Sequence, residues 1–132
     1  MVRKRGAYIL YLEVQRPLAL NIGALGHRQF PAGHYAYIGS ACGGIDRRIA
    51  RHRRLAVSGN GKPHWHIDYL LLDPEVRLEE EKPLSKSSEC AISRAIASRQ
   101  GVTVPVPGFG ATDCRAGCEA HLYRMTDRAH RK

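Results

Sequence analysis

Apolar residues gather in short runs along the first third of the chain, as they do in β-strands. Residues 6–14 and 18–22 are rich in β-branched, aromatic and leucine side chains, and residues 34–39 form a third such run. Residues 23–33 lie between the second and third runs and read as a turn-rich connection. The pattern therefore predicts three strands that pair as an antiparallel sheet.

From Ile45 the spacing of apolar residues changes to that of a helix. The buried face is predicted to carry Ile45, Ile49, His52 and Leu55 or Ala56. Asp46 lies in the first turn, where the helix dipole favours a negative charge. Gly59-Asn60-Gly61 is expected to end the helix.

The second half of the chain predicts further strands and one more helix. In chain order we expect a strand at 64–72, a short strand at 75–80, a helix within 85–101, a strand running into a loop at 102–110, and a last strand at 120–125. Strands and helices in this order predict an α+β fold: a small, mostly antiparallel sheet flanked by helices, with extra strands. Residues 1–5 read as a basic leader, 6–125 as the domain, and 126–132 as a polar tail.

Composition narrows the class of protein. The chain has 132 residues and 43% hydrophobic content, which suits one compact domain. Its net charge of +9 favours a polyanionic partner such as nucleic acid, although a basic soluble protein without such a partner has the same charge. The apolar run near the N-terminus is too short for a signal peptide, and no segment is long enough to span a membrane. Four cysteines do not make a disulfide scaffold, so we expect a reducing cytoplasm with thiols buried or bound to metal.

The predicted helix at Ile45 is dense in arginine. Arg47, Arg51 and Arg54 share one stripe at about 100° per residue, and Arg48 and His52 share a neighbouring stripe closer to the buried face. The first stripe is therefore predicted to contact nucleic-acid backbone, or else to be a solvated basic face. Arg48 needs a defined partner because it lies nearer the sheet.

Short motifs lie in this helix and in the segments before and after it. They are Gly6-Ala7-Tyr8, Tyr37-Ile38-Gly39, Arg48 followed four places later by His52, and Glu89 early in the second helix. In this order they resemble the GIY-YIG nuclease superfamily. Longer pieces, "GSACGG", "HWHIDYLL" and "GFGATDC…HLY", resemble a small prokaryotic branch described as Uri-superfamily endonuclease-like. The resemblance covers most of residues 6–125.

The resemblance implies a metal-dependent endonuclease acting on DNA, with RNA as the less favoured substrate. Tyr8 or Tyr37 would help to activate water, and Glu89 would bind one divalent cation, Mg²⁺ or Mn²⁺. Arg48 would hold the phosphate, with Arg47 as the less favoured alignment. His52 would orient a partner or be a core histidine. Tyr35 shares a strand face with Tyr37 and is expected to line the site. In the alternative interpretation, the tyrosines are strand residues that pack in a core, and Glu89 stabilises the start of a helix.

Two competing functions remain open at this point. A binding module would keep the fold and the arginine helix but lack cleavage. An adaptor stabilised by zinc would be built around Cys114, Cys118 and His121, with Cys90 or Asp113 as a candidate fourth ligand. The alternative for these residues is a set of small buried thiols.

A second polar face is predicted in the strand at 64–72. His64, His66 and Asp68 would alternate onto one side of that strand. They would bind a metal or phosphate, or form a hydrogen-bond network, and the network is the favoured interpretation because a clear third metal ligand is lacking.

Overall fold

Two antiparallel β-sheets and three α-helices make up the described part of the chain, which covers residues 6–41, 45–85, 89–111 and 118–125 of a computed structural model, with backbone alone at positions 41, 85 and 89. The elements in chain order are β1 (Gly6–Val14), β2 (Leu18–Asn21), the 3-10 helix η1 (Gly23–Leu25), β3 (His27–Phe30), β4 (Gly33–Ala41), α1 (Ile45–Ser58), α2 (His66–Leu71), β5 (Val76–Ser85), α3 (Glu89–Ala97), β6 (Val102–Thr103) and β7 (Leu122–Met125). The predicted α+β class is confirmed. Within this described part, no helix combines the length and apolar character needed to cross a membrane.

The larger sheet has five strands in the order β5-β1-β4-β7-β6. β1 lies between β4 and β5 and pairs antiparallel with both. The register places Tyr8 opposite Gly39 and Leu10 opposite Tyr37. The two motifs that contain Tyr8 and Tyr37 therefore lie on neighbouring strands, because β1 and β4 pair along their whole length.

A bulge in β5 changes which face its side chains occupy. Tyr11 pairs with Glu80 while Leu12 pairs with Leu78, so Glu79 is an extra residue on β5. Val76 and Leu78 pack in the same core cluster as β1 residues Leu12 and Val14, whereas Leu84, beyond the bulge, packs in the other cluster. The bulge thus lets one long strand contribute apolar side chains to both faces of the sheet.

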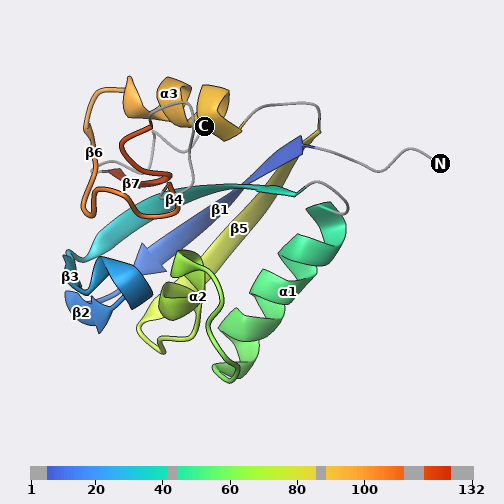
Figure 1. The fold of residues 1–132 in the computed structure, drawn as a ribbon, viewed down its shortest axis with the longest axis vertical. Coiled ribbons are helices and arrows are strands. Elements are labelled where there is room, and N and C mark those ends of the chain that lie inside the picture. Colours follow the sequence, from blue (N-terminus) through green and yellow to red (C-terminus); the bar gives the residue numbers. More distant parts are fainter. Residues whose placement is uncertain (1–5, 42–44, 86–88, 112–117, 126–132) are drawn as a thin grey trace.

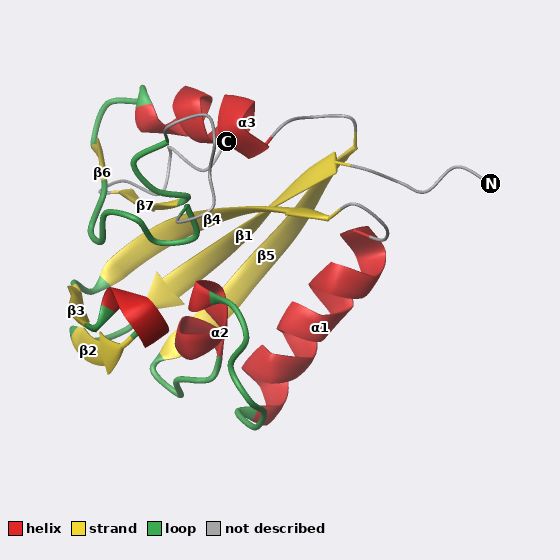
Figure 2. Ribbon diagram, in the orientation of Figure 1, coloured by secondary structure: helices red, strands yellow, loops and turns green. Residues whose placement is uncertain are grey.

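Two hydrophobic cores lie on the two faces of the sheet. Alternate residues of β1 and β4, including Tyr8, Leu10 and Tyr37, pack against α1 and α2. The intervening residues, including Ile9 and Ile38, pack against α3. The sheet is therefore a layer between α1 and α2 on one side and α3 on the other (Figures 1 and 2).

Several boundaries differ from the sequence predictions. The three predicted strands do not form one sheet: β2 pairs with β3 in a separate two-stranded sheet, and β3 lies inside residues 23–33, which were predicted to be a connection. β5 is longer than the predicted 75–80, because its pairing with β1 continues past the bulge. α1 begins at Ile45 and ends before Gly59, as predicted.

The predicted strand at 64–72 is wrong, because this segment contains the helix α2. Ile67, Leu70 and Leu71 are buried, which is the i, i+3, i+4 spacing of a helix face. The Asp68 carboxylate accepts hydrogen bonds from the backbone N–H groups of His64 (2.7 Å) and Trp65 (3.0 Å). These bonds satisfy donors that a helix N-terminus leaves without intrahelical partners, so Asp68 stabilises the start of the helix.

Candidate active site

A tyrosine and a histidine form a buried hydrogen bond at the centre of the site. The Tyr8 hydroxyl oxygen lies 2.7 Å from His52 Nε2, and each residue is only 1% exposed. Tyr8 lies on β1 and His52 lies on α1. His52 belongs to the buried face of α1, as its helical spacing predicted, and therefore points to the sheet. The Tyr37 ring lies near His52, with centroids 6.5 Å apart, and is 8% exposed. The structure therefore brings together the two tyrosines and the histidine that the motifs had singled out.

Gly39, the last residue of Tyr37-Ile38-Gly39, is required by the position of Tyr8. A Cβ atom at Gly39 would lie against both Cζ and the hydroxyl oxygen of Tyr8, closer than real Cβ contacts come. Gly39 faces Tyr8 across the strand pair, so the missing side chain leaves the space that the phenol occupies. This gives the glycine a physical role that the motif alone did not explain.

The environment of His52 keeps its imidazole neutral. The pKa of His52 is lowered to about 4, mainly by burial; the charge of Asp68 opposes this shift, and the charges of Arg51 and Arg48 contribute to it. Its Nδ1 atom is buried and has no hydrogen-bond partner among the described residues. At neutral pH His52 is therefore an uncharged partner for the Tyr8 phenol.

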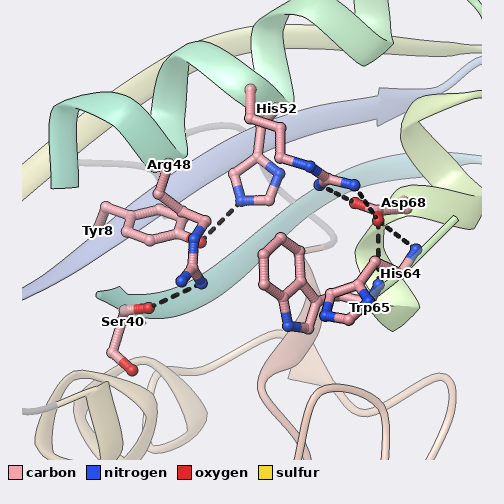
Figure 3. Close-up of polar contacts among 8 residues, drawn as sticks. Tyr8, Ser40, Arg48, His52, His64, Trp65 and Asp68 are labelled. Atoms are coloured by element: carbon pink, nitrogen blue, oxygen red, sulfur yellow. Dashed lines mark hydrogen bonds and ion pairs between the residues drawn. The ribbon is translucent and has the colours of Figure 1, made fainter. Parts of the chain in front are cut away.

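Two arginines of α1 lie against the indole of Trp65. The central guanidinium carbon of Arg48 is 4.2 Å from the ring centroid and that of Arg51 is 4.7 Å away. Arg48 also donates to the Ser40 carbonyl oxygen at 3.3 Å, its one hydrogen bond among the described residues. Figure 3 shows Arg48 beside both Tyr8 and Trp65. Arg48, rather than its neighbour Arg47, lies at the tyrosine–histidine pair.

Arg51 is not a free, solvent-facing arginine, and the predicted stripe is wrong at this position. Its two terminal nitrogens each donate to one oxygen of Asp68 at 3.0 Å. The Asp68 side chain is 0% exposed and that of Arg51 is 24% exposed. Burial alone would raise the pKa of Asp68, but hydrogen bonds from Arg51, Trp65 and His64 outweigh it and lower that pKa. Arg51 therefore joins α1 to α2.

Arg47 and Arg54 remain exposed on α1, as predicted. Tyr35 does not line the site: it is 0% exposed and its hydroxyl donates to the Pro31 carbonyl oxygen at 2.5 Å. Burial accordingly raises the pKa of Tyr35. Tyr35 belongs to the core because its ring packs among buried residues of the α1 and α2 face.

The predicted face of His64, His66 and Asp68 does not form, because these residues belong to the start of α2 and not to a strand. His64 is exposed and packs on Trp65 with ring centroids 4.5 Å apart. His66 Nδ1 instead accepts a hydrogen bond from the Gly110 N–H at 2.8 Å. Asp68 and His66 both make hydrogen bonds, as the network interpretation expected, but to different segments of the chain. Trp65, to which sequence reasoning gave no site role, lies at the centre of this arrangement.

The described side chains at this site do not by themselves fit a magnesium ion. Asp68 is the carboxylate of the cluster, and it is already bonded to Arg51 and to two backbone N–H groups. Glu89 is the first residue of α3, and its side chain lies outside the described residues. The sequence prediction that Glu89 binds a catalytic cation therefore stays a prediction.

A second group of potential metal ligands lies on the α3 side of the sheet. Cys90, Cys118 and His121 each offer one ligand atom, and these atoms lie within 4.8 Å of one another. This group could hold a metal ion. The structure thus brings together three of the residues predicted as zinc ligands, while Cys114 and Asp113 lie outside the described residues.

A known protein family matches most of the chain. The family described as domain of unknown function DUF123 matches residues 7–132. The chain belongs to the DUF123 family. No curated protein and no solved structure matched the chain. Membership of DUF123 carries no assigned activity, so the nuclease function stays a prediction.

Proposed function

We propose that this DUF123 protein is a metal-dependent endonuclease that hydrolyses phosphodiester bonds in nucleic acid, with DNA preferred over RNA. One observation carries the proposal: the buried Tyr8–His52 hydrogen bond lies beside the guanidinium of Arg48, with Tyr37 on the next strand. A phenol, a neutral imidazole and a guanidinium are the groups that water activation and phosphate binding need. The net charge of +9 supports a polyanionic substrate.

His52 orients the Tyr8 phenol but is too weak a base to take its proton. In the tautomer that carries its proton on Nδ1, His52 accepts a hydrogen bond from the Tyr8 hydroxyl at Nε2. Moving the proton from an ordinary phenol, with a pKa of about 10, to an imidazole with a pKa of about 4 costs on the order of 8 kcal/mol. Ionising the phenol therefore requires a further positive charge.

Arg48 supplies one such charge and a binding group for phosphate. A guanidinium has five N–H donors, and Arg48 uses one of them in its hydrogen bond to the Ser40 carbonyl. Its remaining donors suit two oxygens of one phosphate. Stacking on Trp65 restricts the guanidinium, which lowers the entropy cost of binding a phosphate there.

A divalent cation, Mg²⁺ or Mn²⁺, is the other charge that the proposal requires. Bound at Glu89, it would stabilise negative charge as the phosphodiester bond breaks. Its ligand is predicted from the sequence, so metal dependence has to be tested directly.

A nicking assay tests this function. The substrates are plain duplex, single-stranded, flap, junction and abasic DNA and a structured RNA, each with Mg²⁺, with Mn²⁺ and with EDTA. We expect at least one DNA to be cut only with metal. Tyr8→Phe and Glu89→Ala should bind that substrate and leave it whole.

Two matched controls separate catalysis from folding and charge. Tyr11→Phe removes a phenol from the same strand but on the opposite face, and should cut normally. Arg47→Ala removes an exposed arginine next to Arg48 and should weaken binding only, whereas Arg48→Ala should abolish cutting. Equal cutting by Tyr8→Phe and wild type would refute the assignment of the site.

A binding module is the second candidate function. It is favoured by the buried state of Tyr8 and by the absence of an available carboxylate among the described residues of the site. In that case the protein binds nucleic acid in a salt-dependent way and cuts nothing in the panel.

A further inference from the structure

A ligand cluster lies where the first turn of α3 meets the segment leading into β7. Cys90 is the second residue of α3, and its Sγ atom lies 3.9 Å from His121 Nε2. Cys118 lies three residues before His121, and all three ligand atoms lie within 4.8 Å of one another. Two segments that are 28 residues or more apart in sequence therefore bring two thiols and one imidazole close together.

One of the three ligand-to-ligand distances is close to that of tetrahedral zinc, and all three lie within 4.8 Å. With Zn–S bonds of about 2.3 Å and Zn–N bonds of about 2.0–2.1 Å, tetrahedral ligands lie about 3.6–3.8 Å apart. The Cys90–His121 distance of 3.9 Å needs a contraction of only a few tenths of an ångström to reach that range. His121 is 2% exposed, so its ring is held in place by packing and would lose little freedom on binding.

The alternative of small buried thiols fits less well. Neither Cys90 nor Cys118 belongs to the buried residues of either core, and both are only half-buried, unlike thiols that serve as small apolar fillers. No disulfide joins these two cysteines in the described part of the chain. His121 Nε2 lies within hydrogen-bond distance of Cys90 Sγ, so a third potential ligand faces the two thiols, which buried apolar thiols would not require.

We propose that Cys90, Cys118 and His121 bind one zinc ion that joins α3 to the sheet. On binding, the two thiols lose their protons and His121 Nε2 provides a neutral ligand, so each Zn²⁺ bound releases up to two protons. A fourth position remains for water or another ligand. α3 has nine residues, which is too short for a stable isolated helix, so a metal at its first turn would contribute directly to its docking.

The zinc site also has a consequence for the other face of the sheet. The His121 carbonyl oxygen accepts the Ile38 N–H at 2.9 Å, and Ile38 is the neighbour of Tyr37 in β4. Glu89 immediately precedes Cys90 in α3. If the proposed nuclease function holds, the zinc site is a positioning device that sets the backbone of Glu89 relative to β4.

Thiol alkylation of the full-length wild-type protein tests zinc binding without any mutation. The protein is stripped of metal, treated with iodoacetamide with or without zinc, digested and analysed by mass spectrometry. With free zinc at about 100 times its dissociation constant, alkylation of Cys90 and Cys118 should slow about 100-fold, because only the metal-free site reacts. Cys42 serves as the internal reference and should react at the same rate in both samples.

Metal analysis of matched variants provides the second measurement. Wild type should hold about one zinc per chain. Cys90→Ser and His121→Asn should lose it, whereas the control variants Cys42→Ser and His27→Asn should keep it. Replacement of zinc by Co²⁺ should produce a thiolate-to-cobalt charge-transfer band that the first pair lacks.

Two results would overturn the zinc site. One is alkylation of Cys90 and Cys118 at equal rates with and without zinc. The other is a Cys90–Cys118 disulfide in protein that holds no metal. Neither result depends on cleavage of nucleic acid, so failure of the zinc site and failure of the nuclease function are distinguishable. For the positioning role, Cys90→Ser should lower the cutting rate while DNA binding is unchanged.

Discussion

Folding stability should fall in mild acid because of His52. The pKa of His52 is lowered from 6.5 to about 4 in the folded protein, since burial disfavours the charged imidazole. Between these two values the unfolded chain binds a proton that the folded protein does not. Stability from this group is therefore fully present above about pH 6.5 and is lost progressively as the pH falls towards 4.

The size of this effect follows from the two pKa values. With 6.5 for the unfolded chain and about 4 for the folded protein, lowering the pH from about 7.5 to 5.0 should remove about 2 kcal/mol of unfolding free energy. Carboxylates contribute little in this range because their ordinary pKa values lie near 4. Asp68, whose pKa is lowered, contributes only below that range.

Urea unfolding of wild type and His52→Gln at several pH values measures the effect. His52→Gln should be less stable than wild type at pH 7.5. Between pH 7.5 and 5.0, the loss of unfolding free energy should be about 2 kcal/mol smaller in His52→Gln than in wild type. NMR titration of the His52 imidazole should give a midpoint near 4 and, through its nitrogen shifts, the tautomer. Parallel pH profiles for the two proteins, or a midpoint near 6.5, would refute the reasoning.

Three further predictions concern the α1–α2 contact, the exposed arginines and the zinc site. Asp68→Ala should lower the unfolding free energy by about 2–3 kcal/mol in urea titrations, because it leaves Arg51 unpaired and removes the acceptor at the start of α2; a loss below about 1 kcal/mol would contradict this. Changing Arg47 and Arg54 together to Ala should reduce the slope of log affinity against log salt on duplex DNA by up to about 1.8, and an unchanged slope would show that they make no phosphate contacts. If Cys114 is the fourth zinc ligand, Cys114→Ser should weaken zinc binding in a competition titration, whereas unchanged affinity would indicate a site with three protein ligands.

Local patterns were enough to predict much of the fold. The bounds of β1 and α1 follow from apolar spacing and from the glycine that ends the helix, both of which act over a few residues. The convergence of Tyr8, Tyr37 and Arg48 followed from motifs whose spacing is set by one strand pair and one helix. For the same reason Arg48 and His52, four residues apart, share a helix face.

The remaining features depend on contacts between distant segments, which local patterns do not contain. Residues 64–72 have enough apolar residues for either a strand or a helix. The helix forms because Asp68 bonds to Arg51 of α1 and because the apolar residues of the segment are buried on one helix face. The charge of Arg51 pointed to solvent or phosphate, but its partner lies 17 residues further along the chain. Cys90 and His121 are 31 residues apart and meet only because α3 packs on the sheet beside β7. The sequence by itself determined which residues are candidates for chemistry and on which helix or strand face most of them lie. Only the tertiary structure decided which of them are neighbours, because the energy of an ion pair, a stacked ring or a ligand cluster depends on distances that folding sets.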